Sequence, residues 1–228
     1  MEKNEFESRI CFGCGRKITF KEFCQRNRGL EPQLLNILWN NTHLEFFCCL
    51  CYDDYEKEVH IDQQIKDLEP DQLEVIKIVE RKYGLDIPLV SKIEYNRTGF
   101  TIKENNISGL NIFRSEIDKI PGILSKLSNL EVLGFPWNNI QKIPYFIKGL
   151  KSLRELDLSG NDIKFIPAHF HFMCSLEELD LSFNDIQNIP EVFKTLPHLK
   201  SLNLIHNKII ESPLFIHQLE EKGIQILL

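Results

Sequence analysis

The chain has 228 residues, of which 43% are hydrophobic, so it is long enough for one large or two modest globular domains. Its 33 Asp and Glu residues outnumber its 27 Lys and Arg residues, and the net charge of −6 argues against broad electrostatic binding to nucleic acid. The sequence has no run of about 18 apolar residues, which a membrane-spanning helix requires. The first residues are charged and lack an apolar core, so we expect no signal peptide and a cytoplasmic location.

Five of the seven cysteines lie in two short clusters near the start of the chain. Cys11 and Cys14 form one Cys-x-x-Cys pair, and Cys48 and Cys51 form a second. In a cytosolic chain this clustering favours metal binding over disulfides. Zn²⁺ prefers four soft ligands in a tetrahedron, and each pair can reach the ion from one tight turn. The sequence therefore predicts one zinc ion, which is structural because four protein ligands leave no open position for catalysis.

The same clusters leave alternatives open. Cys49 could replace Cys48 as a ligand, although its side chain should point the other way along an extended segment. The thiols could also be free or form a redox pair, but thioredoxin-like chemistry needs a βαβ context that is missing here. Gly15 directly follows the first pair, and a helix is expected to begin at the second. This order resembles that of treble-clef zinc fingers, and it implies a small α+β zinc-binding domain over residues 1–69.

Basic residues gather between the two cysteine pairs. Only Glu22 opposes the positive charges of Arg16, Lys17, Lys21, Arg26 and Arg28. One hypothesis is a nucleic-acid-associated regulator that binds through this basic face of the zinc finger. The absence of an aromatic stacking set and the adjacent acidic stretch favour a solvated surface instead.

Residues 70–106 are predicted to form a cap for the repeats that follow, because the first unit of an array has no upstream neighbour to cover its apolar face. A helix is expected from Asp71 to Tyr83, with Gly84 ending it in a left-handed conformation. Apolar runs at 93–95 and 100–102 flank the turn-like sequence NRTG, which predicts a β-hairpin.

Residues 107–228 are built on a repeat of constant length. Segments that begin at Ile107, Leu130, Leu153, Leu176 and Leu199 align without insertion or deletion, and each begins 23 residues after the one before. A fixed period of this size indicates stacked supersecondary units. Alternation in the LDL segments indicates a short strand in each unit, with the leucines inward and the aspartates outward.

These segments resemble leucine-rich repeats, in the 23-residue form with an Ile-Pro pair that archaeal and bacterial proteins carry. The resemblance implies an α/β fold: a right-handed solenoid of five repeats with parallel strands on its concave face. It also implies a ladder of buried asparagines, here Asn138, Asn161, Asn184 and Asn207, with Ser115 at the first position. The convex segments are expected to begin at Pro144, Pro167 and Pro190. The resemblance also implies that the protein binds other proteins, but it does not identify the partner.

A partner is expected to bind at the outward positions of the strands, because the consensus residues of each repeat are buried in the core or form the asparagine ladder. Adjacent strands lie about 5 Å apart, so acidic residues near the centre of the array should form one patch. Apolar and aromatic side chains beside them are typical of binding hot spots. The predicted contact residues are Phe113, Arg114, Trp137, Glu155, Asp157, Glu178, Asp180, Phe183, Ile205 and His206.

No catalytic motif is evident: the sequence lacks a phosphate loop, HExxH and GxSxG. The leading interpretation is a non-enzymatic adaptor or scaffold with a zinc-stabilised N-terminal domain. An accessory factor of a ubiquitin-like or small-GTPase system is a further hypothesis, without direct support in the sequence. The final segment, residues 224–227, reads as an edge strand, and such a strand can pair with a second copy or a partner.

Overall fold

A computed structural model describes residues 8–10, 17–26, 65 and 68–228. The chain divides into two compact units, residues Met1–Gln63 and Gln64–Leu228. In the first unit, β1 (Ser8–Ile10) pairs antiparallel with β2 (Lys17–Thr19), and α1 (Phe20–Arg26) follows. Thr19 and Glu22 form a reciprocal cap at the start of α1, with Thr19 N donating to Glu22 Oε2 over 2.8 Å. The predicted zinc ligands Cys11, Cys14, Cys48 and Cys51 lie outside the described residues.

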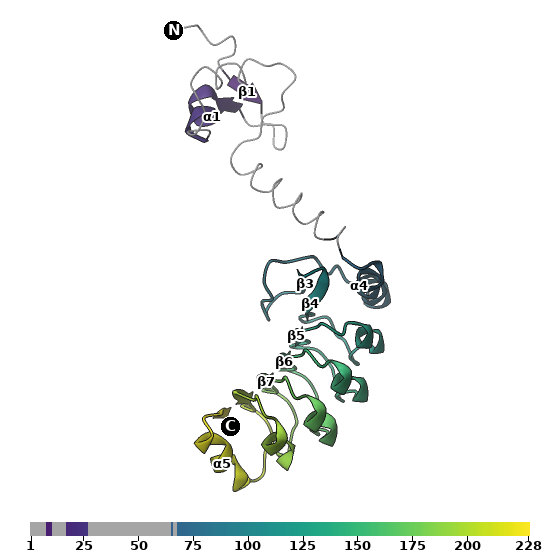
Figure 1. Cartoon of the computed structure of the whole chain (residues 1–228), viewed down its shortest axis with the longest axis vertical. Helices are drawn as coiled ribbons and strands as arrows, with labels where there is room; N and C mark the ends of the chain where they lie inside the picture. Colours follow the sequence, from purple (N-terminus) through teal and green to yellow (C-terminus); the bar gives the residue numbers. More distant parts are fainter. Residues whose placement is uncertain (1–7, 11–16, 27–64, 66–67) are drawn as a thin grey trace. The chain divides into compact units, whose positions relative to one another are not determined.

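The second unit is organised around one sheet of seven strands, in chain order (Figure 1). The first pair is antiparallel, and every later pair is parallel. Along one row the register joins Gly109, Val132, Glu155, Glu178 and Ser201, which are spaced by 23 residues as the repeat requires. The strands are β3 (Gly99–Lys103), β4 (Asn106–Asn111), β5 (Val132–Gly134), β6 (Glu155–Asp157), β7 (Glu178–Asp180), β8 (Ser201–Asn203) and β9 (Gln225–Leu227).

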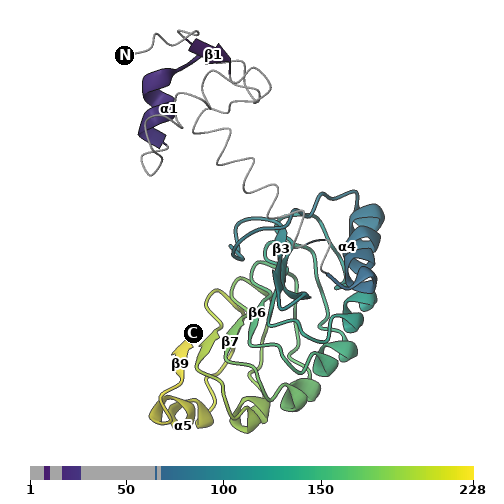
Figure 2. The ribbon, with the colours of Figure 1, turned by 45° about the horizontal axis from the view of Figure 1, so that its top comes forward.

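Short helical turns form the outer side of this unit, and the strands line its inner side (Figure 2). They are the 3-10 helices η1 (Gly122–Lys126), η2 (Tyr145–Gly149), η3 (Ala168–Phe172) and η4 (Glu191–Thr195), followed by α5 (Phe215–Glu221). Each of η2, η3 and η4 is preceded directly by the proline predicted to start it, since a fixed φ favours the helical turn. The unit from Leu153 shows which side chains fill the core, since seven of its residues are buried, namely Leu153, Leu156, Leu158, Ile163, Ile166, Phe170 and Met173.

The asparagine ladder is present and links each unit to the one before it. Asn184 Oδ1 accepts from Ile163 N over 2.9 Å, and its Nδ2 donates to Leu158 O over 2.8 Å. Asn138, Asn161 and Asn207 make the equivalent bonds one unit apart. These bonds satisfy backbone groups that would otherwise be buried without partners.

The cap begins with α4 (Pro70–Tyr83), which ends at Gly84 with φ of 65°, as predicted. The expected hairpin around NRTG is wrong, because residues 93–95 form no strand. The hairpin is β3–β4, and its turn is Glu104–Asn105, where both residues have positive φ. Asn adopts this conformation more readily than most residues. Strand β4 therefore serves both the cap hairpin and the first parallel pair of the repeats.

None of the helices within the described ranges is long and apolar enough to cross a membrane. The edge strand expected near the end of the sequence is β9, which pairs in parallel with β8. Self-association through the outer edge of β9 stays a prediction.

Candidate partner-binding surface

The inner face of the sheet is partly occupied by the loop of residues 90–98, which we call the cap loop. It crosses β4 and β5, where two glycines make room for it. A Cβ atom on Gly109 would lie 2.5 Å from Thr101 Oγ1 and 2.8 Å from Ile93 Cγ1, and one on Gly134 would meet the Asn111 amide first and Tyr95 Cδ1 at 3.2 Å. A strand glycine often marks a site where another segment approaches closely. The open part of the inner face therefore begins at β6.

Hydrogen bonds to the strands fix the cap loop in this position. Asn111 Nδ2 donates to Arg97 O over 2.6 Å, and Phe113 N donates to Thr98 Oγ1 over 3.0 Å. Tyr95 reaches furthest along the sheet, where its hydroxyl donates to Glu155 Oε2 over 2.8 Å. Burial and the neighbouring Glu155 carboxylate raise the pKa of Tyr95, so the phenol stays protonated and remains a donor.

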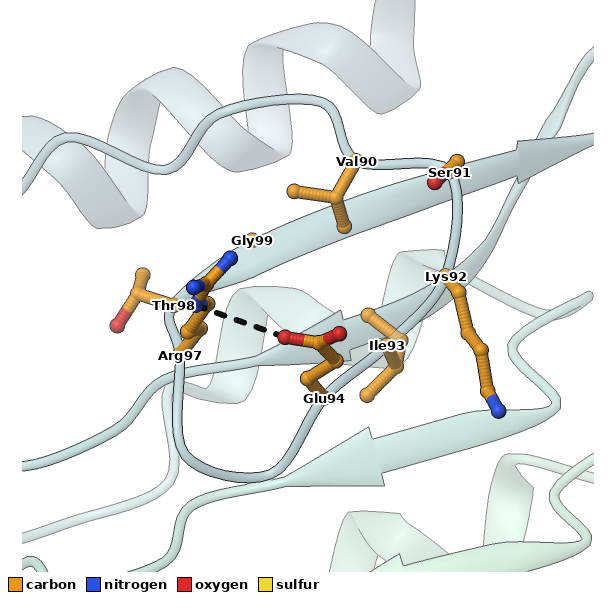
Figure 3. A pocket seen from close by; sticks show the side chains of 8 residues that line it. All are labelled: Val90, Ser91, Lys92, Ile93, Glu94, Arg97, Thr98 and Gly99. Atoms are coloured by element: carbon orange, nitrogen blue, oxygen red, sulfur yellow. Dashed lines mark ion pairs between the residues drawn. The ribbon is translucent and has the colours of Figure 1, made fainter.

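The cap loop also encloses a pocket of about 210 Å³ (Figure 3). An ion pair between Glu94 and Arg97, with Oε2 and Nε 3.5 Å apart, lies within the loop. Both side chains are more than half exposed, and ion pairs of this kind contribute little to stability. We assign this pocket to the packing of the loop, because it holds no buried polar side chain that could recognise a ligand.

The four predicted acidic contacts differ in exposure. Glu178 is exposed, and Glu155 and Asp180 are half-buried. Asp157 is 7% exposed, so the expectation that all four carboxylates face solvent is wrong for this residue. Its Oδ1 accepts from Ser159 N over 2.8 Å, which turns the carboxylate back onto its own strand. Burial raises the pKa of Asp157 to about 6, and the bonds from Ser159 oppose that shift.

A hollow of about 170 Å³ lies over the open strands. Asp180 is among its lining residues and accepts three hydrogen bonds, from Ser182 N over 2.8 Å, from Ser182 Oγ over 2.6 Å and from Asn203 Nδ2 over 2.8 Å. Fixed carboxylates of this kind present a preformed negative surface to a partner. The hollow is lined by Tyr95, Glu155, Leu156, Asp157, Glu178, Leu179, Asp180, Ser201, Asn203 and Leu227.

A second row of predicted contacts lies just after the strands, and we call it the exit ladder. Its five members are spaced by 23 residues, and all have positive φ: Arg114 at 47°, Trp137 at 57°, Gly160 at 64°, Phe183 at 53° and His206 at 56°. Positive φ is unusual for bulky residues and persists only where the surroundings impose it. Side-chain hydrogen bonds bracket four of the five positions: Asn138, Asn161 and Asn184, and Ser115 at the first, each donate to the carbonyl two residues earlier. Asn184 Nδ2, for example, donates to Ser182 O over 3.1 Å and so brackets Phe183.

The side chains of the exit ladder stack on one another and still face solvent. Trp137 and Phe183 are each 44% exposed, with ring centroids 5.4 Å apart. The two residues belong to units separated by a third, so their backbones should lie about 10 Å apart. Their rings meet because Gly160, between them, has no side chain. Phe183 continues the stack to His206 at 4.3 Å, and Arg114 lies 5.4 Å from the Trp137 ring.

The remaining predicted contacts are less accessible. Phe113 is half-buried and lies 5.2 Å from the Arg114 guanidinium carbon, and Ile205 is half-buried at the same position four units later. They line the border between the exit ladder and the sheet. Phe183 of the exit ladder follows Asp180 by three residues in the unit that also carries Glu178, and Glu155 pairs with Glu178 from the unit before.

Sequence reasoning missed Tyr95 and Ile93 as parts of this surface. Their own segment has no periodicity that would indicate its destination. The one indication in the sequence that another segment covers β4 and β5 is the pair Gly109 and Gly134. Both occupy outward strand positions at which the other units carry larger side chains. Within the described residues, no group of three or more His, Cys, Asp or Glu side chains could hold a metal ion.

Two family models match the part of the chain that carries this surface. One, described as "Leucine rich repeat", matches residues 128–186, and another, "Leucine Rich repeats (2 copies)", matches residues 174–215. Residues 128–215 are leucine-rich repeats. Proteins with such repeats generally bind other proteins and are typically non-enzymatic.

Two solved structures of leucine-rich repeat proteins are similar to this chain. The leucine-rich repeat ectodomain of the receptor kinase SOBIR1 from Arabidopsis thaliana is 20% identical, with a TM-score of 0.53, over 70% of this chain and 92% of that one. An internalin, InlF, from Listeria monocytogenes is 26% identical, with a TM-score of 0.46, over 53% of this chain and 34% of that one. The first likeness supports the fold alone. No curated protein sequence matches the chain.

Proposed function

We propose that this protein is a non-catalytic adaptor whose leucine-rich repeats bind a protein partner across β6–β8 and the exit ladder. The observation that carries the proposal is the stack of Trp137, Phe183 and His206, which is exposed and yet rigidly held. Aromatic side chains that are fixed before binding lose little conformational entropy on contact, which is why they dominate interface hot spots.

The neighbouring carboxylates favour a partner segment that carries positive charge. Glu178 is exposed, and Glu155 and Asp180 are oriented by hydrogen bonds. A partner segment with a basic residue beside an apolar one matches this arrangement of negative charge and rings.

Comparative affinity purification tests this function. The full chain and the double variant Trp137→Ala/Phe183→Ala are used as baits, and bound proteins are quantified by mass spectrometry. We expect a set of partners retained by the wild-type chain and lost by the variant. Phe165→Ala is the matched control, because Phe165 is 74% exposed and belongs neither to the sheet nor to the exit ladder. Equal retention by all three baits contradicts the placement of the surface.

For the N-terminal unit we propose one structural zinc ion held by Cys11, Cys14, Cys48 and Cys51. The support is the spacing of the two Cys-x-x-Cys pairs. Metal analysis of the purified chain should give one zinc per molecule. A chelator should unfold this unit while the repeats keep their circular dichroism, because binding energy for such sites is folding energy.

A further inference from the structure

A cluster on the outer side of the repeats is not used by the partner surface described above. Tyr145 on η2 is 63% exposed, and Phe172 on η3 is 40% exposed. The two residues belong to adjacent units, and η2 packs beside η3. Exposed aromatic side chains on neighbouring turns form more apolar surface than a single scattered residue would.

Two lysines converge on these rings. Lys148 Nζ lies 3.7 Å from the centroid of the Tyr145 ring and 4.8 Å from that of Phe172, and it also bonds the Tyr145 hydroxyl. Lys151 Nζ lies 5.6 Å from the Phe172 centroid and donates to Phe172 O over 3.2 Å. In the described part of the chain, no carboxylate forms an ion pair with either ammonium group. Two like charges therefore share one ring without a counterion among the residues that the structure describes.

A histidine also borders this cluster. His169 packs edge-on against Tyr145 at 5.3 Å, and its Nε2 is buried with no hydrogen-bond partner among the described residues. Burial lowers the pKa of His169, the Pro144 backbone opposes that shift, and Lys148 adds to it, so the net shift favours the neutral imidazole. The positive potential comes from the two lysines, which the rings hold in place by cation–π contact.

We propose that Tyr145, Lys148, Lys151 and Phe172 form a second docking surface, which binds a short acidic segment of a partner protein. Carboxylates of that segment replace the missing counterions, and an apolar residue beside them covers the Phe172 ring. The equivalent position one unit earlier than Phe172 is Gly149, and the space beside it is open, because a Cβ atom there would meet nothing within 4 Å.

The size of the basic surface favours a short segment over a membrane or a nucleic acid. Lys148 lies on η2 and Lys151 two residues after its end, and η1 adds only Lys126, whereas Lys194 on η4 pairs with Glu191, and Glu220 and Glu221 follow in α5. A membrane surface or a nucleic acid would meet these acids, and the overall charge of −6 would oppose both.

Selection from a library of random twelve-residue peptides tests the proposal. The full chain is immobilised, and binders to a Lys148→Glu/Lys151→Glu variant are removed first. We expect the recovered peptides to be rich in Asp and Glu next to Phe, Tyr or Leu. The best of them should bind the double variant at least tenfold more weakly, and Phe172→Ala several-fold more weakly, than the wild-type chain.

Lys77→Glu/Lys82→Glu is the matched control, since both lysines are exposed on α4 and the charge change is the same. It should change the affinity by less than twofold, and Trp137→Ala should leave it unchanged. Equal losses with both charge reversals overturn the proposal, because they indicate only long-range attraction. A selection that yields no acidic peptides overturns it too, as does stronger binding to anionic vesicles or to single-stranded RNA than to the selected peptide.

Discussion

The indole ring of Trp137 fills the space that a side chain on Gly160 would need: a Cβ atom on Gly160 would lie 2.7 Å from Trp137 Cδ2. The stack between Trp137 and Phe183 therefore depends on a residue that contributes no side chain of its own. Gly160 has φ of 64°, a conformation that also disfavours any replacement.

Gly160→Ala should separate the two rings and destabilise the repeats by about 1–2 kcal/mol, because the methyl group meets the indole and the backbone becomes strained. Tryptophan fluorescence and urea unfolding measure the two effects. Gly149→Ala is the control, since its Cβ would meet nothing within 4 Å, and it should leave both measurements almost unchanged. An unshifted emission spectrum in Gly160→Ala would show that the stack does not need the glycine.

Tyr95→Phe should release the cap loop from the open part of the sheet. The variant loses the hydroxyl that donates to Glu155, and one such bond contributes about 0.5–1.5 kcal/mol. Amide hydrogen exchange across residues 90–98 should become faster in the variant. Tyr145→Phe, which alters an exposed hydroxyl, should leave exchange in this loop as it is in the wild-type chain.

Asp157→Asn should change how stability depends on pH. The folded-state pKa of Asp157 is raised from 3.8 to about 6, so the fold favours the protonated acid. Its stabilising contribution is fully present below pH 3.8 and is lost as pH rises through about 6. The asparagine variant should therefore be more stable than the wild type at pH 7.5, by about 1–3 kcal/mol, and similar to it near pH 4.

Urea midpoints at several pH values measure this difference. The exposed Asp162 provides the control, and Asp162→Asn should follow the wild-type curve. A constant offset between Asp157→Asn and the wild type, at every pH, would show that Asp157 does not titrate in this range.

Asn184→Ala should destabilise the array strongly, because it leaves Ile163 N and Leu158 O buried without their partners. Each orphaned group costs about 1–3 kcal/mol, so we expect a loss of about 2–4 kcal/mol in urea unfolding. Asn188→Ala, at an exposed position four residues later, should change stability by less than about 0.5 kcal/mol. If the two variants unfold alike, the ladder does not stabilise the fold.

The repeats could be predicted from the sequence because their contacts recur at one fixed interval. A residue such as Leu156 meets Leu133 and Leu179, so the period alone places it in the core. The cap loop has no such regularity. Tyr95 and Glu155 are 60 residues apart, and no pattern in either segment predicts their contact.

The candidate surface was predictable only in part for the same reason. The 23-residue period predicts that the positions from Arg114 to His206 form one row. The contact between the Trp137 and Phe183 rings depends in addition on the absence of a side chain at Gly160. Alternation correctly separates Asp157 from the leucines beside it, yet it cannot show that neighbouring units and the Ser159 backbone enclose its carboxylate.

The unbroken register of the parallel strands has a consequence for how this surface can change. Every unit supplies one residue to each row, and no bulge interrupts the pairing from β4 to β8. Insertion or deletion of a whole 23-residue unit would therefore keep all remaining rows aligned and would lengthen or shorten the surface by one strand spacing, about 4.8 Å. A change of one or two residues would instead misalign every row beyond it. The length of the surface can therefore change only by whole units, whereas a single substitution changes one side chain in one row.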